Sequence, residues 1–271
     1  MITGTNGFIG QRLLEYTKKF DFDVCGVDAT YFGAKNWKTE LVSCLNTLDP
    51  SFIFHVGACS DTLENDIQFM MTRNYESTKV ITDWCCENDR RIIYSSSAAN
   101  YGESGLYPSN LYGWSKYVAE DYVVKSGGIA LRYFNVYGPG EQNKGRMASF
   151  LYQAFLKHQA NEKIFIFPGN PRRDFVYIED VLTANIYAHS KYEELKGNFY
   201  EVSTGRAHTF EEKLQMFGFE YFYTEKDKIP TGYQFYTCGN PHKWMPGWKP
   251  KFYLEEGVLD YKQKLENEYS N

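Results

Sequence analysis

Short apolar segments alternate along most of the chain with longer segments in which apolar residues recur at helical spacing. Continuous apolar runs are typical of strands that are buried on both faces of a parallel sheet. Strands are expected at residues 24–27, 52–56, 91–94, 129–134 and 199–203. Helices are expected over 41–48 and 62–88, from about 112 onward, and in segments that end near 158 and 189. This alternation predicts the α/β class, with a Rossmann-type, doubly wound parallel sheet.

Three glycines follow a short apolar strand at the start of the chain. Gly4, Gly7 and Gly10 lead into a helical pattern whose inner face is expected to include Leu13 and Phe20. Glycines in this context allow a tight turn and a close approach of the backbone to a pyrophosphate. The following helix offers free N–H groups and the positive end of its dipole to that anion. We therefore expect a dinucleotide site at these glycines.

Two residues bear on which dinucleotide is bound. Asp28 ends the second expected strand, where an acidic side chain can bind the adenosine ribose hydroxyls and would repel a 2′-phosphate. Lys35 follows shortly afterwards and could instead pair with that phosphate. The residues leave NAD and NADP both open.

A tyrosine and a lysine stand one helical turn apart at Tyr112 and Lys116. An ammonium there is expected to lower the tyrosine pKa from its usual value of about 10, so that the phenol exchanges a proton near neutral pH. Ser97, at the end of the strand that begins at residue 91, could donate a hydrogen bond to the same substrate oxygen. Together they predict an acid–base site for alcohol and carbonyl chemistry. Alone the pair is weak, because the chain contains 23 tyrosines.

Polar residues inside the predicted elements admit two readings. Asn74 lies in the middle of the helix expected over 62–88, either on its solvated face or as an inward amide that orders Lys116 through water. His55 is expected to be a core residue rather than a ligand. The small residues at 57–60 stand where a strand would meet a cofactor.

The regular pattern loosens after about residue 140, and the chain becomes aromatic and irregular from residue 209. We expect a Rossmann domain over 1–140, with 174–204 returning to it. Residues 141–173 and 205–271 are expected to form a smaller C-terminal substrate-binding domain. Such a domain would cap the carboxyl ends of the sheet, where ligands of these folds bind.

Composition narrows the range of partners. The net charge of −5 provides no basic field for nucleic acid or for an anionic membrane. No apolar run approaches the length of a membrane span, and we expect no signal peptide ahead of the glycines. The six cysteines form neither a Cys-x-x-Cys pair nor a metal-ligand spacing. We expect a cytoplasmic protein with reduced thiols, no metal, and no nucleic-acid or membrane partner.

Taken in order, the motifs resemble the extended short-chain dehydrogenase/reductases, the NAD-dependent epimerase/dehydratase family. The glycine motif, the serines at 95–97 followed by Tyr101-Gly102, the Tyr112-x-x-x-Lys116 pair and the segment 132–139 (RYFNVYGP) carry this resemblance. It covers nearly the whole chain. It implies a Rossmann domain, a smaller substrate domain, a nicotinamide cofactor, a nucleotide-sugar substrate and a homo-oligomer.

Within that family the chain resembles the ADP-L-glycero-D-manno-heptose 6-epimerases in three stretches: 55–60 (HVGACS), 135–149 (NVYGPGEQNKGRMAS) and 173–177 (RDFVY). Those enzymes bind NADP and invert the exocyclic C6″ by oxidation and re-reduction. The resemblance implies that Tyr112 and Lys144 are the two acid/base residues. Lys116 would support Tyr112, and Ser97 would hold the reacting oxygen. On this ground NADP is slightly preferred over NAD.

The resemblance also assigns binding residues. Those expected at the cofactor are Gly4, Gly7, Phe8, Ile9, Gly10, Asp28, Lys35, Gly57, Ala58, Asn74, Tyr112, Lys116 and Val136. Those expected at the nucleotide-sugar are Ser97, Asn135, Arg146, Arg173 and Tyr233.

The chain departs from the heptose epimerases at several points. Arg146 replaces their serine, Gln153 replaces their histidine, and the segment from Asp28 to Phe52 is short and lacks the third strand's usual acidic residue. The sugar and nucleotide therefore stay open, and a UDP-hexose 4-epimerase is an alternative. A dehydratase would have an Asp-Glu pair where Ala98 and Ala99 stand. A non-catalytic cofactor-binding protein is the remaining alternative.

Overall fold

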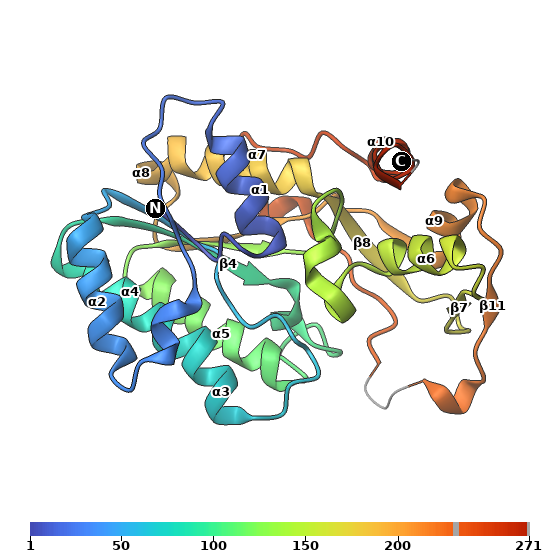
Figure 1. Cartoon of the computed structure of the whole chain (residues 1–271), viewed down its shortest axis with the longest axis horizontal. Helices are drawn as coiled ribbons and strands as arrows, with labels where there is room; N and C mark the ends of the chain where they lie inside the picture. The colour runs from blue at the N-terminus through green and yellow to red at the C-terminus, as the bar shows by residue number, and fades with distance from the viewer. Residues whose placement is uncertain (230–232, 270–271) are drawn as a thin grey trace.

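The computed structural model describes residues 1–229 and 233–269. Its centre is a parallel sheet of six strands in the order β2-β1-β3-β4-β5-β9 (Figure 1). The strands are β1 (Ile2–Thr3), β2 (Gly26–Val27), β3 (Phe52–His55), β4 (Arg91–Ser97), β5 (Ile129–Tyr133) and β9 (Asn198–Val202). The strand order reverses between β1 and β3, which is where open α/β sheets bind ligands at their carboxyl edge. The predicted fold class is confirmed.

Helices cover both faces of this sheet. Three lie on one face: α1 (Phe8–Thr17), α7 (Ile178–Ser190) and α8 (Tyr192–Leu195). The opposite face carries α2 (Trp37–Leu48), α3 (Ile67–Met71), α4 (Ser77–Glu87) and α5 (Leu111–Lys125). Successive residues of a strand point to opposite faces, so Phe54 joins one apolar core and Ile53 the other. Each fully buried aliphatic side chain contributes roughly 1.5–3 kcal/mol to stability.

Two sequence expectations about helices are corrected. The first helix ends at Thr17, so Phe20 lies beyond it and is 39% exposed instead of facing the core. The helix expected from residue 62 begins at Ile67, where the Asp66 side chain caps it by accepting from the Phe69 N–H at 2.9 Å. It then passes through a π-helical turn, Thr72–Glu76, before continuing as α4.

The sheet has no further strand beyond β2 at its outer edge. Between β2 and β3 the chain forms a 3₁₀ turn, Ala29–Gly33, and then α2. The sheet therefore ends at the two-residue strand β2. The absence of a strand here agrees with the short segment between Asp28 and Phe52 in the sequence. Elements other than the sheet must therefore form the pocket wall next to Asp28.

The C-terminal part of the chain forms a second lobe (Figure 1). Its strands are β6 (Asn135–Tyr137), β8 (Arg172–Tyr177) and β10 (Ala207–Thr209) in one sheet, with β7 (Phe165–Ile166) and β11 (Phe222–Tyr223) paired separately. Its helices are α6 (Phe150–Gln159), α9 (Phe210–Phe217) and α10 (Leu254–Tyr269). The turn Glu141–Met147 leads into it. None of the described helices is both long and apolar enough to cross a bilayer.

Candidate active site

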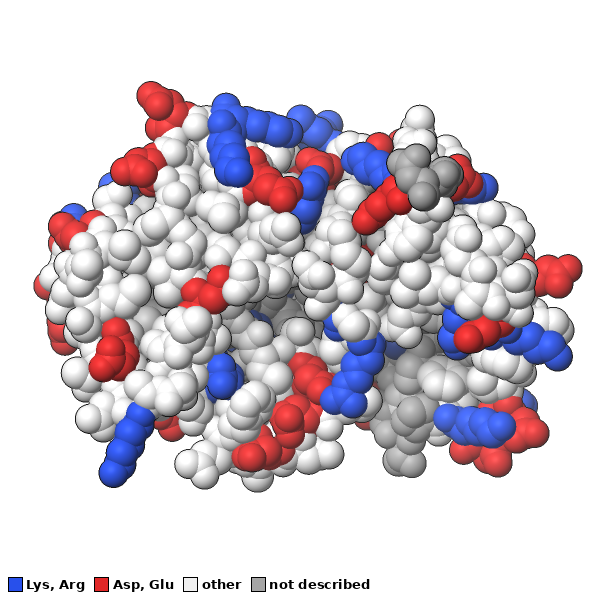
Figure 2. Space-filling view, viewed as in Figure 1, with Lys and Arg blue, Asp and Glu red and all other residues white. Residues whose placement is uncertain are grey.

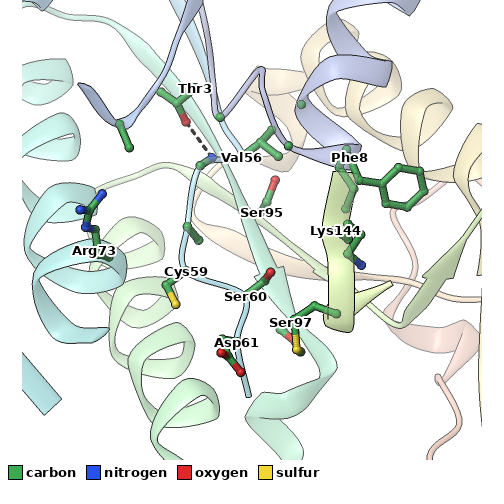
Figure 3. A pocket seen from close by; sticks show the side chains of 18 of the residues that line it. Thr3, Phe8, Val56, Cys59, Ser60, Asp61, Arg73, Ser95, Ser97 and Lys144 are labelled. Atoms are coloured by element: carbon green, nitrogen blue, oxygen red, sulfur yellow. Dashed lines mark hydrogen bonds between the residues drawn. The ribbon is translucent and has the colours of Figure 1, made fainter. Parts of the chain in front are cut away.

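A cavity of about 600 Å³ lies at the carboxyl edge of the sheet, and the turn that contains Lys144 forms one of its walls. Its volume falls within the range of small-molecule and cofactor pockets. The face shown in Figure 2 is hollowed near its centre, between the two lobes. Figure 3 shows the loop that follows β3 running past the pocket, with Ser97 and Lys144 on other walls. The cavity is the strongest candidate for a functional site in the described part of the chain.

The glycine motif lines one wall of the pocket with closely packed backbone that leaves no room for a Cβ atom. Gly4 has a positive φ of +72°, and a Cβ there would stand 2.6 Å from the Cα of Gly57. A Cβ on Gly10 would stand 2.1 Å from the carbonyl oxygen of Gly4. The first turn of α1 contains no acidic side chain, so its N–H groups remain available to an anion. This backbone fits a dinucleotide pyrophosphate.

A chain of buried hydrogen bonds fixes the loop after β3. The Gly57 N–H donates to Thr3 Oγ1 at 2.9 Å, the dashed line in Figure 3. Thr3 Oγ1 lies 2.8 Å from His55 Nδ1, and His55 Nε2 lies 2.9 Å from Thr78 Oγ1. Because the Thr78 hydroxyl donates to the Asn74 carbonyl at 2.6 Å, it accepts from His55, which sets the Nε2–H tautomer. Burial, and next the Lys116 charge, lower the His55 pKa to about 3.

Asn74 occupies the π-helical turn and is 1% exposed. Its Oδ1 accepts from the Cys59 N–H at 2.7 Å, and its Nδ2 donates to the Cys59 carbonyl at 2.9 Å and to Ser115 Oγ at 2.9 Å. The solvated-face reading of Asn74 is therefore wrong. Its amide is directed inward, but it contacts Ser115 rather than Lys116, the next residue. It thereby ties the loop after β3 to α5.

The Asp28 carboxylate lines the pocket and is held from two sides. Thr5 Oγ1 donates to it at 2.7 Å and the Asn6 N–H at 3.0 Å. Its remaining lone pairs can accept from ribose hydroxyls. Lys35 is exposed and is not among the residues that line the pocket.

Tyr112 and Lys116 both line the pocket, on the first two turns of α5. Asn110 caps that helix by accepting from the Gly113 N–H at 2.8 Å. Burial raises the pKa of the Tyr112 hydroxyl, and its hydrogen bond with Ser97 acts in the opposite direction. Burial also lowers the pKa of Lys116 to about 7. The expected lowering of the Tyr112 pKa by Lys116 is therefore wrong for this pocket, because both groups are dehydrated and each favours its neutral form.

Lys144 reaches the pocket from the turn Glu141–Met147. Its Nζ lies 5.4 Å from the ring centroid of Phe8, the first residue of α1. Burial lowers the pKa of Lys144, opposed by the charge of Glu141. Glu141 is fully buried and anchors the turn by accepting from Ser149 Oγ at 2.8 Å and Tyr261 Oη at 2.9 Å. The turn thus places a lysine with a lowered pKa on a wall of the pocket separate from that of Tyr112.

The structure brings most of the expected site residues together. Those that line the pocket are Gly4, Gly7, Phe8, Ile9, Gly10, Asp28, Gly57, Ala58, Ser97, Tyr112, Lys116, Val136 and Lys144. Those that do not are Lys35, Asn74, Asn135, Arg146, Arg173 and Tyr233.

Three of the residues outside the cavity lie on or beside β8, in the second lobe. The Arg173 guanidinium carbon lies 5.2 Å from the Tyr233 ring centroid. Asn135 Nδ2 donates to the Asp174 carbonyl at 3.3 Å. Arg146 is 70% exposed and forms an ion pair with Asp61, whose side chain lines the pocket. In this structure Arg146 therefore points to the pocket rim and not into the cavity.

Sequence reasoning missed the wall beyond Asp28. That wall includes Tyr31, Phe32, Phe69 and Arg73. The one sequence signal for this wall was that Arg73 directly precedes Asn74, which was expected at the cofactor. The helical spacing gave no indication of the π-helical turn that orients both residues.

The central sheet is of the Rossmann type, and the pocket at its carboxyl edge is lined by the glycine motif, Asp28, Tyr112 and Lys116. These features are typical of dinucleotide-binding α/β proteins. Residues 1–203 match the NAD dependent epimerase/dehydratase family. The chain belongs to this family, and the predictions of the family and of an epimerase are confirmed.

The relatives include epimerases of two kinds. The ADP-L-glycero-D-manno-heptose-6-epimerase of Brachyspira hyodysenteriae is 32% identical over 98% of this chain and 97% of its own length. The crystal structure of the Helicobacter pylori enzyme of that name is 27% identical, with a TM-score of 0.81 over 97% of this chain and 94% of that one. The UDP-glucose 4-epimerase of Thermotoga maritima has a TM-score of 0.84 over 98% of both chains at 23% identity, and so shares the fold.

Proposed function

We propose that this chain is an NAD(P)-dependent nucleotide-sugar epimerase that acts on ADP-glycero-manno-heptose. It inverts a carbinol centre by transient oxidation and re-reduction. The observation that carries the proposal is the placement of Tyr112 with Ser97 and of Lys144 on separate walls of one pocket. The heptose-epimerase relative, which aligns with 98% of this chain, supports the choice of substrate.

Inversion at a carbinol needs proton exchange in two substrate orientations. A bound nicotinamide cofactor would supply the hydride acceptor for oxidation of this carbon and the hydride donor for its re-reduction. Ser97 donates a hydrogen bond to the reacting oxygen, and Tyr112 takes its proton as the carbonyl forms. The carbonyl then turns within the pocket. Lys144 gives a proton to the oxygen in the new orientation as the carbon is reduced.

Burial in the pocket shifts the pKa values of both acid/base groups. Burial lowers the pKa of Lys144 from its usual value, so the neutral and charged forms are closer in free energy than for an exposed lysine. Burial raises the pKa of Tyr112, which disfavours the phenolate that accepts the substrate's proton, and the hydrogen bond with Ser97 partly offsets that effect. Lys144 therefore releases a proton more readily than an exposed lysine does.

The second lobe supports binding of the nucleotide diphosphate. Burial lowers the pKa of Arg173, and among the described residues no carboxylate pairs with it. A half-buried guanidinium without a carboxylate partner favours a phosphate as its partner. Tyr233 and Asn135 lie beside it on the same lobe. We assign residues 141–173 and 205–271 to substrate binding on this ground.

For the cofactor, Asp28 supports NAD, because its carboxylate faces the pocket and would repel a 2′-phosphate. The resemblance to the heptose epimerases and the presence of Lys35 favour NADP instead. If Lys35 swings to a 2′-phosphate, Lys35→Ala weakens NADP by roughly 1–3 kcal/mol and leaves NAD unchanged. Calorimetric titration with both cofactors decides between them. Equal affinities in the wild type and the variant would remove Lys35 from the site.

The deciding experiment is turnover of ADP-D-glycero-D-manno-heptose, followed by NMR at C6″. Inversion there is the expected result. Inversion at C4 of a UDP-hexose, with none at C6″, would keep the redox site and overturn the substrate. Cofactor binding without turnover of any nucleotide-sugar would favour the non-catalytic alternative. A homo-oligomeric state and a cytoplasmic location belong to the proposal and rest on the sequence.

A further inference from the structure

Arg73 contributes a cation to the Asp28 end of the pocket that no sequence motif assigns. It lies in the π-helical turn, directly before the buried Asn74. Its guanidinium carbon stands 3.9 Å from the ring centroid of Phe32 and 5.1 Å from that of Phe69. No carboxylate among the described residues forms an ion pair with it. Figure 3 shows Arg73 on its helix, to one side of the loop after β3.

The surroundings of Arg73 are aromatic. Phe32 packs against Tyr31 and Trp37, with ring centroids 4.5 and 5.0 Å apart. A second, smaller hollow of about 280 Å³ adjoins the main cavity here and shares Phe32, Phe69 and Arg73 with it. The cavity is therefore open at its Asp28 end, where the sheet has no strand beyond β2.

The position of Asp28 determines what must lie in this region. A ribose whose hydroxyls bind Asp28 carries its base at the adjoining carbon, so the base occupies the aromatic end of the cavity. A planar base gains free energy by stacking on a flat surface, and an arginine guanidinium provides one. The Phe32 ring lies against that guanidinium and Phe69 lies farther from it, so aromatic contacts hold the Arg73 side chain at the wall of the cavity.

We propose that Arg73, held flat by Phe32, is the surface on which the adenine of the bound dinucleotide stacks. Arg73 and Phe32 together form the pocket wall that a further strand beyond β2 would otherwise provide. This inference rests on the dinucleotide-binding part of the proposed function and is independent of which sugar is turned over.

The backbone supports the rigidity that stacking needs. Asn74, the next residue, is tied to the N–H and the carbonyl of Cys59. The start of the Arg73 side chain is therefore fixed relative to the loop that forms the pocket wall. A preorganised surface loses little conformational entropy when the base binds.

The experiment is calorimetric titration of the purified chain with NAD, NADP, ADP-ribose and nicotinamide mononucleotide. Arg73→Ala is expected to weaken NAD, NADP and ADP-ribose alike, by about tenfold or more, as loss of a base-stacking contact does. Nicotinamide mononucleotide lacks adenine, so its affinity stays unchanged. Arg73→Lys keeps the charge but not the plane, and is expected to behave as Arg73→Ala.

Lys38→Ala is the matched control. Lys38 lies 5.4 Å from the Trp37 ring centroid in the same cluster but outside the lining of the cavity. Its removal is expected to leave all four affinities unchanged. A melting temperature close to that of the wild type for Arg73→Ala confirms that the fold is retained.

Other outcomes overturn the inference in distinct ways. Loss for NADP alone would make Arg73 a phosphate ligand. Full recovery in Arg73→Lys would mean that charge, not stacking, matters. Equal loss for nicotinamide mononucleotide would indicate general collapse of the pocket, and unchanged affinities would remove Arg73 from the site. A wild type that binds NAD but does not invert ADP-heptose would sink the proposed substrate and leave this inference standing.

Discussion

Arg146 and Asp61 form an ion pair that joins two walls of the pocket. Asp61 belongs to the loop after β3, and Arg146 follows the residue pair Lys144 and Gly145 in the second wall. Gly145 has φ 53° and ψ −128°, a backbone conformation that turns the chain between the inward Lys144 and the outward Arg146. Gln153 Nε2 donates to the Arg146 carbonyl at 3.2 Å. The two departures from the heptose-epimerase pattern therefore contact each other.

This pair predicts that Arg146→Ser raises turnover of ADP-heptose, because it restores a small hydroxyl and removes a contact across the rim. The melting temperature should change little, since Arg146 is 70% exposed and exposed pairs are weak. Salt screens such pairs. The wild-type kcat/KM is therefore expected to rise with ionic strength, and that of Arg146→Ser to stay flat.

Asp61→Asn breaks the same pair from the other side and should also lose the salt dependence. If both variants turn over ADP-heptose more slowly than the wild type, the pair positions the substrate instead of restricting its access. The experiment is steady-state kinetics at low and high salt.

The sequence predicted the frame of the site because that frame depends on local rules. Glycines between a strand and a helix, and a tyrosine and lysine one turn apart, are positions that backbone geometry alone brings to one edge. The apolar runs predicted the central strands because a sheet covered on both faces admits few polar residues. Gly4, Tyr112 and Lys116 accordingly line the pocket as expected.

The remainder depends on burial and on irregular backbone. Spacing placed Lys116 near Tyr112 but gave no measure of dehydration, which reverses the expected shift of the Tyr112 pKa. The π-helical turn that directs Asn74 inward and Arg73 to the pocket has no signature in helical spacing. Arg146 was expected at the substrate because its neighbours match a motif, whereas its side chain pairs with Asp61.

The amide of Asn74 predicts a stability effect. Asn74→Leu keeps the volume but leaves the partly buried Cys59 N–H without the acceptor that it has at 2.7 Å. Loss of this contact and of the one to Ser115 should lower the free energy of unfolding by about 2–4 kcal/mol. NAD should also bind more weakly, because the loop that contains Cys59 lines the pocket.

Urea denaturation and calorimetry measure the two effects of Asn74→Leu. Glu76→Gln is the control in the same π-helical turn, because Glu76 forms an ion pair with Lys38 on the surface. An Asn74→Leu protein as stable as Glu76→Gln would mean that the loop is held by its other contacts.

Lys213 predicts a pH dependence of stability. It is 1% exposed in α9, with its Nζ 4.0 Å and 3.9 Å from the ring centroids of Tyr137 and Phe175. Burial lowers the pKa of Lys213 to about 7. Between about pH 7 and pH 10 the unfolded chain therefore carries a proton on this group that the folded chain lacks. Lowering the pH through that window favours unfolding, by at most about 1.4 kcal/mol per pH unit.

Lys213→Met removes this contribution. The variant should exceed the wild type in stability by the largest margin at about pH 7 and below, where the charged lysine is buried. That margin should shrink as the pH approaches about 10. Urea denaturation across this range measures it. Lys157→Met, on the exposed face of the neighbouring helix α6, is the control and should show no trend. A margin that stays constant with pH would show that packing, not charge, distinguishes the variant.

Tyr112 and Lys144 lie on separate walls of the pocket. We therefore predict that epimerisation requires both residues, whereas an oxidation or a reduction alone requires only one of them. Tyr112→Phe and Lys144→Met should fold and bind cofactor while losing C6″ inversion by several orders of magnitude. An aldehyde analogue at the reacting carbon tests the halves separately. With oxidised and reduced cofactor both supplied, one aldehyde hydrate is oxidised to the acid and another aldehyde is reduced to the alcohol, without inversion. Each variant should retain more of this dismutation than of epimerisation. Tyr117→Phe removes a hydroxyl from the same helix outside the pocket lining and should keep both activities. Near-normal inversion by Tyr112→Phe would remove that tyrosine from catalysis, and near-normal inversion by Lys144→Met would make Lys144 a binding residue only.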